Sequence, residues 1–131
     1  MPYGETTSEE IERVAREIVD GAFKVHSKLG AGLLESVYEE CLAFELKRRG
    51  LTVERQVCVP IIYDGVQLDA AFRIDILVNQ CVLIELKAVE KMIPLYDAQV
   101  LTYLKLTGVR LGILINFNSK LIKDGMTRIV L

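Results

Sequence analysis

The sequence predicts an α/β protein of the α+β type, in which a mixed β-sheet is flanked by helices in the order ααβββαββ. Two observations support this prediction. Apolar residues recur at intervals of three and four in three segments, as in amphipathic helices, and short apolar runs bounded by turn residues are typical of strands. Because the 131 residues contain no internal repeat or linker, we expect one domain over residues 1–131.

Three segments have the apolar spacing of helices, together with residues that begin or end them. They span residues 8 to about 28, about 34 to 49, and 95 to about 106. Thr7 and Glu10 have the spacing of a capping box at the start of the first helix, and a Gly30–Gly32 segment separates it from the second. Gly50 and Gly108 follow the second and the third helix, where glycine commonly ends a helix.

Five segments have the composition of strands: residues 52–63, the segment that follows Asp64-Gly65 and pairs through residues 72–78 with the next strand, and residues 82–88, 111–117 and 122–130. Asp64-Gly65 is a strong signal for a hairpin turn between the first two. The last two enclose a polar connection near residues 118–125. Helices between and before these strands predict a mixed sheet with helices on its faces.

The most informative pattern is Asp75, followed ten residues later by Glu85 in the segment Ile84-Glu85-Leu86-Lys87. Charged groups are costly to bury in apolar strands unless they are paired or bind an ion. Two carboxylates that hold a divalent metal, and an ammonium that stabilises charge or orients a water, are what a phosphodiesterase site needs. The alternative is a solvated polar face on an edge hairpin.

The apolar pattern also predicts the register of this hairpin. A wholly apolar face results if Ile74 faces Leu86, Ile76 faces Ile84, and Val78 faces Val82. Asp75 then lies opposite Glu85, and Arg73 opposite Lys87. Like charges directly across a ladder are destabilising, so this register indicates a bound cation. It requires an odd-length connection or a bulge at residues 79–81.

Two helical residues are further candidates for the site. Glu35 lies near the start of the second helix with Tyr38 on the same face, although an acid there also simply favours the helix dipole. Gln99 lies on the third helix with Tyr103 four residues on, although a solvated glutamine is the alternative.

Gln56 is a third candidate, on the first strand. It would face Arg73 if Asp64-Gly65 forms a two-residue turn, which places it on the Asp75 side of the sheet.

Composition narrows the class of protein. With 51% hydrophobic residues the chain is unlike a disordered segment, and no apolar run approaches the roughly 20 residues of a membrane span. Residues 1–10 lack the pattern of a signal peptide. A net charge of −2 argues mildly against a protein that coats nucleic acid, but not against an enzyme.

The cysteines and the histidine do not have the pattern of a metal site. Cys41, Cys58 and Cys81 lack metal-ligand spacing and are expected as buried thiols in a reducing cytosol, so we expect a cytoplasmic protein. His26 is the single histidine and cannot build a histidine-rich metal site. We expect it on a helix surface or in a cap, with a substrate contact as the alternative.

The segment Gly32-Leu33-Leu34-Glu35-Ser36-Val37-Tyr38 resembles the signature of the GxxExxY proteins, a bacterial and archaeal family similar to the PD-(D/E)XK nuclease superfamily. The resemblance covers nearly the whole chain from about residue 10. It continues through Asp75, Glu85-Leu86-Lys87, Gln99-x-x-x-Tyr103 and Ile115-Asn116-Phe117. It implies a restriction-endonuclease-like mixed sheet with an αβββαβ core.

The resemblance also implies roles for individual residues. By position, Glu35 matches the acid of the first core helix, Asp75 the metal-binding aspartate, Glu85 and Lys87 the (D/E)XK pair, and Gln99 the polar residue of the following helix. Ile74 stands where the superfamily name has proline, at a position that tolerates change. The fold hosts active and inactive members, so sites carry over better than substrate.

We therefore expect a hydrolase, namely a Mg²⁺- or Mn²⁺-dependent nuclease. Asp75 and Glu85, with the carbonyl of Leu86, are expected to hold the ion, and Glu35 a second ion or a metal-bound water. Lys87 and Gln99 are expected to act on water and phosphate oxygens. Residues expected at the wall of the site are Tyr38, Tyr103 and Gln56.

The expected partner is nucleic acid, with DNA ranked ahead of RNA, and no membrane. The alternative function is a non-catalytic nucleic-acid- or protein-binding module that retains the fold, as a homodimer or another homo-oligomer. The acidic net charge and the small size favour this alternative. The intact set of Glu35, Asp75, Glu85 and Lys87 favours the enzyme.

Overall fold

The predicted order of elements is confirmed by the structure, a computed structural model that describes residue 3 and residues 5–131. The elements are α1 (Ser8–Leu29), α2 (Glu35–Arg48), β1 (Val53–Tyr63), β2 (Val66–Val78), β3 (Val82–Lys87), α3 (Pro94–Thr107), β4 (Leu111–Asn116), a 3-10 turn (Ile122–Gly125) and β5 (Met126–Val130). β2 begins at Val66, directly after the predicted turn. One predicted bound was wrong: the last strand begins at Met126 because the preceding residues form the 3-10 turn.

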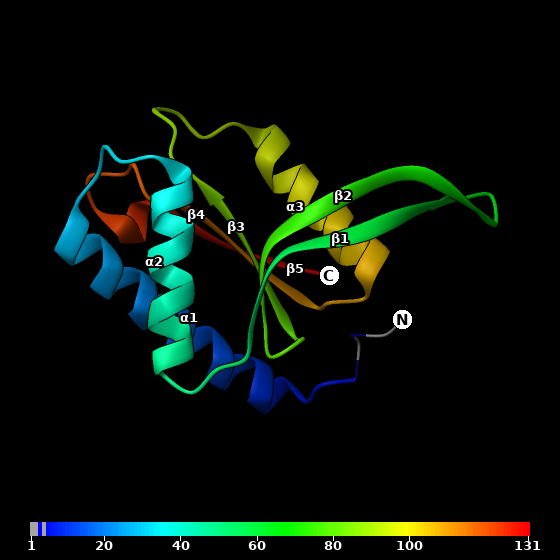
Figure 1. The fold of residues 1–131 in the computed structure, drawn as a ribbon, viewed down its shortest axis with the longest axis horizontal. Coiled ribbons are helices and arrows are strands. Elements are labelled where there is room, and N and C mark those ends of the chain that lie inside the picture. Colours follow the sequence, from blue (N-terminus) through cyan, green and yellow to red (C-terminus); the bar gives the residue numbers. More distant parts are fainter. Residues whose placement is uncertain (1–2, 4) are drawn as a thin grey trace.

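The strands form one five-stranded sheet in the order β1-β2-β3-β4-β5. Only β3 and β4 are parallel, and α3 provides the crossover that a parallel pair needs. Figure 1 shows α1 and α2 on one side of the sheet and α3 on the other. The sheet is therefore mixed and covered by helices on both faces, as the sequence predicted.

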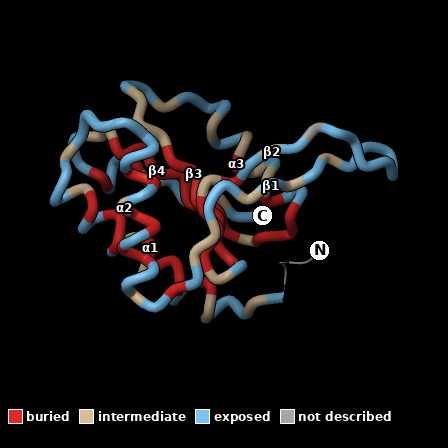
Figure 2. Tube along the Cα trace, in the orientation of Figure 1, coloured by how far each residue is buried: buried red, intermediate tan, exposed pale blue. Residues whose placement is uncertain are grey.

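Each face of the sheet has its own apolar cluster. The larger cluster joins α1 and α2 to one face and includes Ile18, Leu42 and Phe117. The smaller one joins α3 to the other face and includes Val100 and Leu104. Buried residues are concentrated in the central strands β3 and β4, whereas the far end of the β1–β2 hairpin is exposed (Figure 2).

The β1–β2 hairpin is a long arm that extends beyond the helices (Figure 1). Its turn is the predicted two-residue turn, in which Asp64 and Gly65 have φ values of 51° and 78°, and Tyr63 pairs with Val66. The register then shifts between Pro60 and Ile62. The shift changes which residues of β1 and β2 face each other nearer the body of the protein.

The same two strands are irregular again at Gln56 and Asp75. The flanking pairs Arg55–Ile76 and Val57–Ile74 belong to the ladder, whereas Gln56 and Asp75 do not, and Gln56 has a positive φ of 51°. Ile76 packs into the α1–α2 cluster, but Ile74, two residues away, packs into the α3 cluster. On a regular strand, side chains two residues apart point to the same face of the sheet. The ribbon therefore turns over at this point.

The connection between β2 and β3 has the predicted odd length. Asn79 and Gln80 have φ values of 48° and 52°, and the ladder pairs Val78 with Val82 and Ile76 with Ile84. The predicted register is confirmed for these pairs.

Beyond Ile76 and Ile84 the predicted pairing was wrong. Ile74 and Leu86 lie in different clusters rather than on one apolar face, and the β2–β3 ladder ends at Ile76–Ile84, so it does not pair Arg73 with Lys87. The reason is that the ribbon turns over at Asp75, so β2 leaves β3 there.

The expectation of three buried thiols was also wrong. Cys81 is buried, Cys41 is half-buried, and Cys58 is exposed because it lies on the edge strand β1. His26 on α1 places its Nε2 atom 2.8 Å from the carbonyl oxygen of Ser119, so it links the end of α1 to the segment after β4. Among the described helices, none is long and apolar enough to cross a membrane.

Candidate active site

Asp75 and Glu85 meet where β2 leaves β3. The Asp75 N–H donates a hydrogen bond to Glu85 Oε1 at 3.1 Å, and the Leu86 N–H donates to Asp75 Oδ2 at 2.9 Å. Each carboxylate thus accepts a bond from the backbone of the other strand, where the regular ladder has ended. The strands diverge, yet the two predicted acids stay together.

Burial makes this pair of acids unstable as two free anions. Burial, together with the charge of Asp75, raises the pKa of Glu85 to about 8. Burial also raises the pKa of Asp75, against the opposing effect of the Leu86 N–H, and the charge of Glu39 adds to the rise. Because a divalent cation would lower both pKa values, the pair favours such an ion.

Lys87 lies two residues after Glu85 and half-buried. Its Nζ atom is 4.5 Å from the centre of the Tyr96 ring on α3, a cation–π contact. Its charge lowers the pKa of Asp75, Glu85 and Glu35, which shows that the ammonium lies within their field. Within the described chain it forms no ion pair with a carboxylate.

The backbone at Lys87 is held by the end of β4. The Phe117 N–H donates to the Lys87 carbonyl at 2.9 Å. Asn116, which is 4% exposed, accepts from the Val89 N–H at 3.1 Å and donates to the Val89 carbonyl at 3.0 Å. Asn116 therefore fixes the chain just after Lys87.

Glu35 is the first residue of α2, at the same site. Partial burial and the charge of Asp75 raise its pKa. The preceding loop is held by Tyr38, whose hydroxyl donates to the Gly30 carbonyl at 2.6 Å and accepts from the Leu33 N–H at 3.1 Å. Tyr38 is fully buried, and its ring stacks on Phe117 at 4.7 Å. Tyr38 thus supports the start of α2 from within the core.

Two tyrosines of α3, Tyr96 and Tyr103, lie on the side of the site that this helix forms. Burial, followed by the charges of Glu85 and Asp75, raises the pKa of Tyr103, and its ring stacks on Phe72 at 4.3 Å. Gln99 lies three residues after Tyr96 and four before Tyr103, so it is on the helix face that these two tyrosines share.

Gln56 reaches Asp75 rather than facing Arg73, so that part of the prediction was wrong. The register shift between Pro60 and Ile62 places Gln56 opposite Asp75. Its Nε2 atom lies 3.4 Å from Asp75 Oδ1, at the edge of hydrogen-bond distance.

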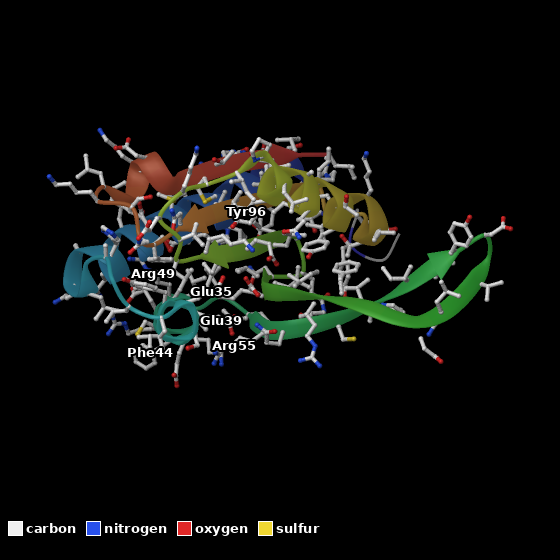
Figure 3. The ribbon with its side chains drawn as sticks, turned by 90° about the horizontal axis from the view of Figure 1, so that it is seen from above. Glu35, Glu39, Phe44, Arg49, Arg55 and Tyr96 are labelled. Atoms are coloured by element: carbon white, nitrogen blue, oxygen red, sulfur yellow. The ribbon has the colours of Figure 1, made fainter. Side chains whose placement is uncertain are left out.

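Glu39 is a site residue that the sequence analysis did not include. It is 7% exposed and accepts hydrogen bonds from Arg55 at 2.9 and 3.1 Å and from Gln56 at 2.7 Å. Figure 3 shows Glu35 and Glu39 between α2 and the base of the β1–β2 hairpin, with Arg55 beside them. The available signal was its position four residues after Glu35, which puts both acids on one helix face.

The acids do not form a complete cage of protein ligands. Within the described part of the chain, no three His, Cys, Asp or Glu side chains converge closely enough to hold a metal ion. Two carboxylates completed by a carbonyl, waters and substrate are nevertheless a usual environment for Mg²⁺.

The mixed sheet with helices on both faces is a nuclease-like α+β fold, and comparison with protein families agrees. The family model of the PD-(D/E)XK nuclease superfamily matches residues 12–129, so the chain belongs to that superfamily. Members of this superfamily typically use divalent metal ions. The narrower GxxExxY assignment stays a prediction. No curated protein and no solved structure gives a significant match.

Proposed function

We propose that this protein is a metal-dependent nuclease that hydrolyses phosphodiester bonds in nucleic acid. The observation that carries the proposal is the pairing of half-buried Asp75 with buried Glu85 at the divergence of β2 and β3, with Lys87 two residues further along β3. An apolar sheet has no structural need for these groups. Membership of the superfamily supports the same reading.

Mg²⁺ or Mn²⁺ fits the donors. Asp75 and Glu85 offer carboxylate oxygens and Leu86 a carbonyl oxygen, and hard divalent cations prefer such ligands. A cation would also relieve the repulsion that raises the pKa of Glu85 to about 8. These three residues would hold the ion, and Glu35 would bind a second ion or an ordered water.

The chemistry supplied by a bound ion is activation of water and stabilisation of negative charge on the phosphate. Lys87, held above Tyr96, would orient the attacking water or pair with a phosphate oxygen. Gln99, on the helix face shared by Tyr96 and Tyr103, would position water or phosphate by hydrogen bonds. Both roles require side-chain contact with water or substrate, and the experiment below tests that of Lys87.

A cleavage assay on one purified variant tests the role of Lys87. Single- and double-stranded DNA and RNA are incubated with Mg²⁺ or Mn²⁺, and Lys87→Ala is compared with wild type. We expect cleavage to fall at least about 100-fold, while the melting temperature and Mn²⁺ affinity remain near those of wild type.

Lys91→Ala is the matched control, because Lys91 is an exposed lysine in the segment that follows β3. It should cleave like wild type. If Lys87→Ala retains full cleavage, the activity comes from a contaminant or from another mechanism, and the proposal fails.

A further inference from the structure

Glu39 and Gln56 form a chain of contacts that ends on Asp75. Glu39 Oε2 accepts two hydrogen bonds from Arg55, and Glu39 Oε1 accepts one from Gln56 Nε2 at 2.7 Å. The same Gln56 nitrogen lies 3.4 Å from Asp75 Oδ1. The two hydrogens of the Gln56 amide are therefore shared between a buried glutamate and the metal-binding candidate aspartate.

The backbone at Gln56 also serves this contact. Its φ of 51° lies in the left-handed region, which costs free energy for a residue with a side chain, and its pair with Asp75 is missing from the ladder. The conformation gives up sheet pairing and places the amide between Glu39 and Asp75. Gln80 has a similar φ but lies in a turn, whereas Gln56 adopts this conformation within a strand.

Each carboxylate oxygen of Asp75 therefore has a donor near it. The Leu86 N–H holds Oδ2 at 2.9 Å, and Gln56 approaches Oδ1. Residues that hydrogen-bond to a metal ligand orient it and commonly contribute a factor of ten to a hundred in metal affinity.

We propose that Glu39 and Gln56 are positioning residues, which orient Asp75 for the ion without touching it. This inference rests on the proposed metal-dependent function. It assigns Glu39 a task other than stabilising the fold, and it makes Arg55 the group that holds the Glu39 carboxylate in place.

The first test replaces Gln56 by methionine, which keeps the length of the side chain but removes its hydrogen bonds. We expect Mn²⁺ affinity, measured by calorimetry, to fall about ten- to a hundredfold, with a modest fall in melting temperature because the buried Glu39 loses one hydrogen-bond donor. Cleavage should fall in parallel at low Mn²⁺ and recover at saturating Mn²⁺.

Gln80→Met is the matched control. Gln80 lies in the turn between β2 and β3, is exposed and has a φ of 52°. Its Nε2 atom is 3.5 Å from Oε1 of Glu54 on β1. The same chemical change is thus made at the same backbone conformation away from Asp75. It should leave Mn²⁺ affinity unchanged.

The second test replaces Glu39 by glutamine and compares it with Glu45→Gln. Glu45 is also buried on α2, 5% exposed, and binds Arg48 and Arg49. Both variants should lose stability, but only Glu39→Gln should weaken Mn²⁺ binding. If Glu39→Gln does not fold, the Gln56 comparison alone decides.

Two failures can be told apart. If wild type binds Mn²⁺ and Asp75→Asn does not, but Gln56→Met binds as tightly as wild type, the positioning role is overturned and the proposed function stands. If wild type itself neither binds Mn²⁺ nor cleaves, the proposed function fails and the inference falls with it.

Discussion

At the scale of single residues, the proton on Glu85 links the charge of the site to the stability of the fold. Glu85 is 7% exposed, and burial and Asp75 raise its pKa to about 8. The folded protein therefore binds this proton more tightly than the unfolded chain, where the carboxyl has a value near 4.5. The stability contributed by the proton is present at low pH and is lost as pH rises from about 4.5 to about 8.

Glu85→Gln should remove this pH dependence. Glutamine is neutral, its oxygen can still accept from the Asp75 N–H, and its amide can donate to the Asp75 carboxylate. In the absence of metal, we expect the variant to be more stable than wild type at pH 9, by at most about 5 kcal/mol at about 1.4 kcal/mol per pKa unit. Near pH 4.5 the difference should vanish.

Urea denaturation in the presence of a chelator, at several pH values, measures this difference. Glu90→Gln, at an exposed glutamate after β3, is the control and should follow wild type at every pH. Equal midpoints for Glu85→Gln and wild type at pH 9 would mean that Glu85 is already ionised without strain.

At the scale of elements, α3 packs closely on the sheet because Gly112 of β4 has no side chain at the contact. A Cβ atom on Gly112 would lie 2.6 Å from Val100 Cγ1 and 3.3 Å from Leu83 Cδ1. The packing of α3 on β4 thus depends on a missing side chain. Since α3 carries Tyr96 and Tyr103, its position also sets the α3 side of the candidate site.

Gly112→Ala should push α3 away from β4. Overpacking of a buried position commonly costs about 1–3 kcal/mol, and we expect a loss of this size in the free energy of unfolding. Val100→Ala in the same chain makes room for the new methyl group. The double variant should be more stable than the sum of the two single changes implies, which a double-mutant cycle measures. Simple additivity would show that the contact does not limit how close α3 comes.

These elements also show what the sequence could predict. The Asp64-Gly65 turn and the β2–β3 register from Val78–Val82 to Ile76–Ile84 depend on local chemistry and on the apolar pattern, so both were predicted correctly. The turning-over at Gln56 and Asp75 depends on a register shift inside the arm and on contacts between three elements. No local pattern encodes it.

The residues of the candidate site also divide into those that a local pattern indicates and those that depend on contacts between elements. Asp75 and Glu85 could be found because charge interrupts apolar strands there. Glu39 shares a helix face with Glu35, but its burial could not be predicted, because a glutamate on an amphipathic helix has the pattern of a solvated residue. Its burial results from how α2 sits on β1, where Arg55 and Gln56 surround it.

At the scale of the whole molecule, the site joins parts of the fold that otherwise separate. Asp75 belongs to the β1–β2 arm, Glu85 to the central strand β3, and Glu35 to α2. The β1–β2 hairpin leaves the body of the sheet at this point (Figure 1). An ion held by Asp75 and Glu85 would therefore link the arm to the sheet, and its binding energy would add to the stability of the folded protein.

Mn²⁺ should raise the melting temperature of wild type, and the effect should depend on pH. A ligand at 100 times its dissociation constant stabilises the folded state by about 2.7 kcal/mol. Binding must displace the proton of Glu85, whose pKa is about 8, so Mn²⁺ affinity should rise by up to about tenfold for each pH unit from 6 towards 8. Above that range it should level off. Thermal denaturation with and without Mn²⁺ and calorimetry in buffers of different ionisation enthalpy measure the stabilisation and the protons released.

Glu85→Ala should show neither the stabilisation nor the pH dependence, because the ligand and its proton are both removed. Glu45→Gln, a change at a buried glutamate outside the site, should keep both even if its baseline stability is lower. Mn²⁺ affinity that is the same at pH 6 and pH 8 would mean that the ion does not compete with the Glu85 proton. A bound ion would then lie at another site. Protein contacts alone would link the β1–β2 arm to the central sheet.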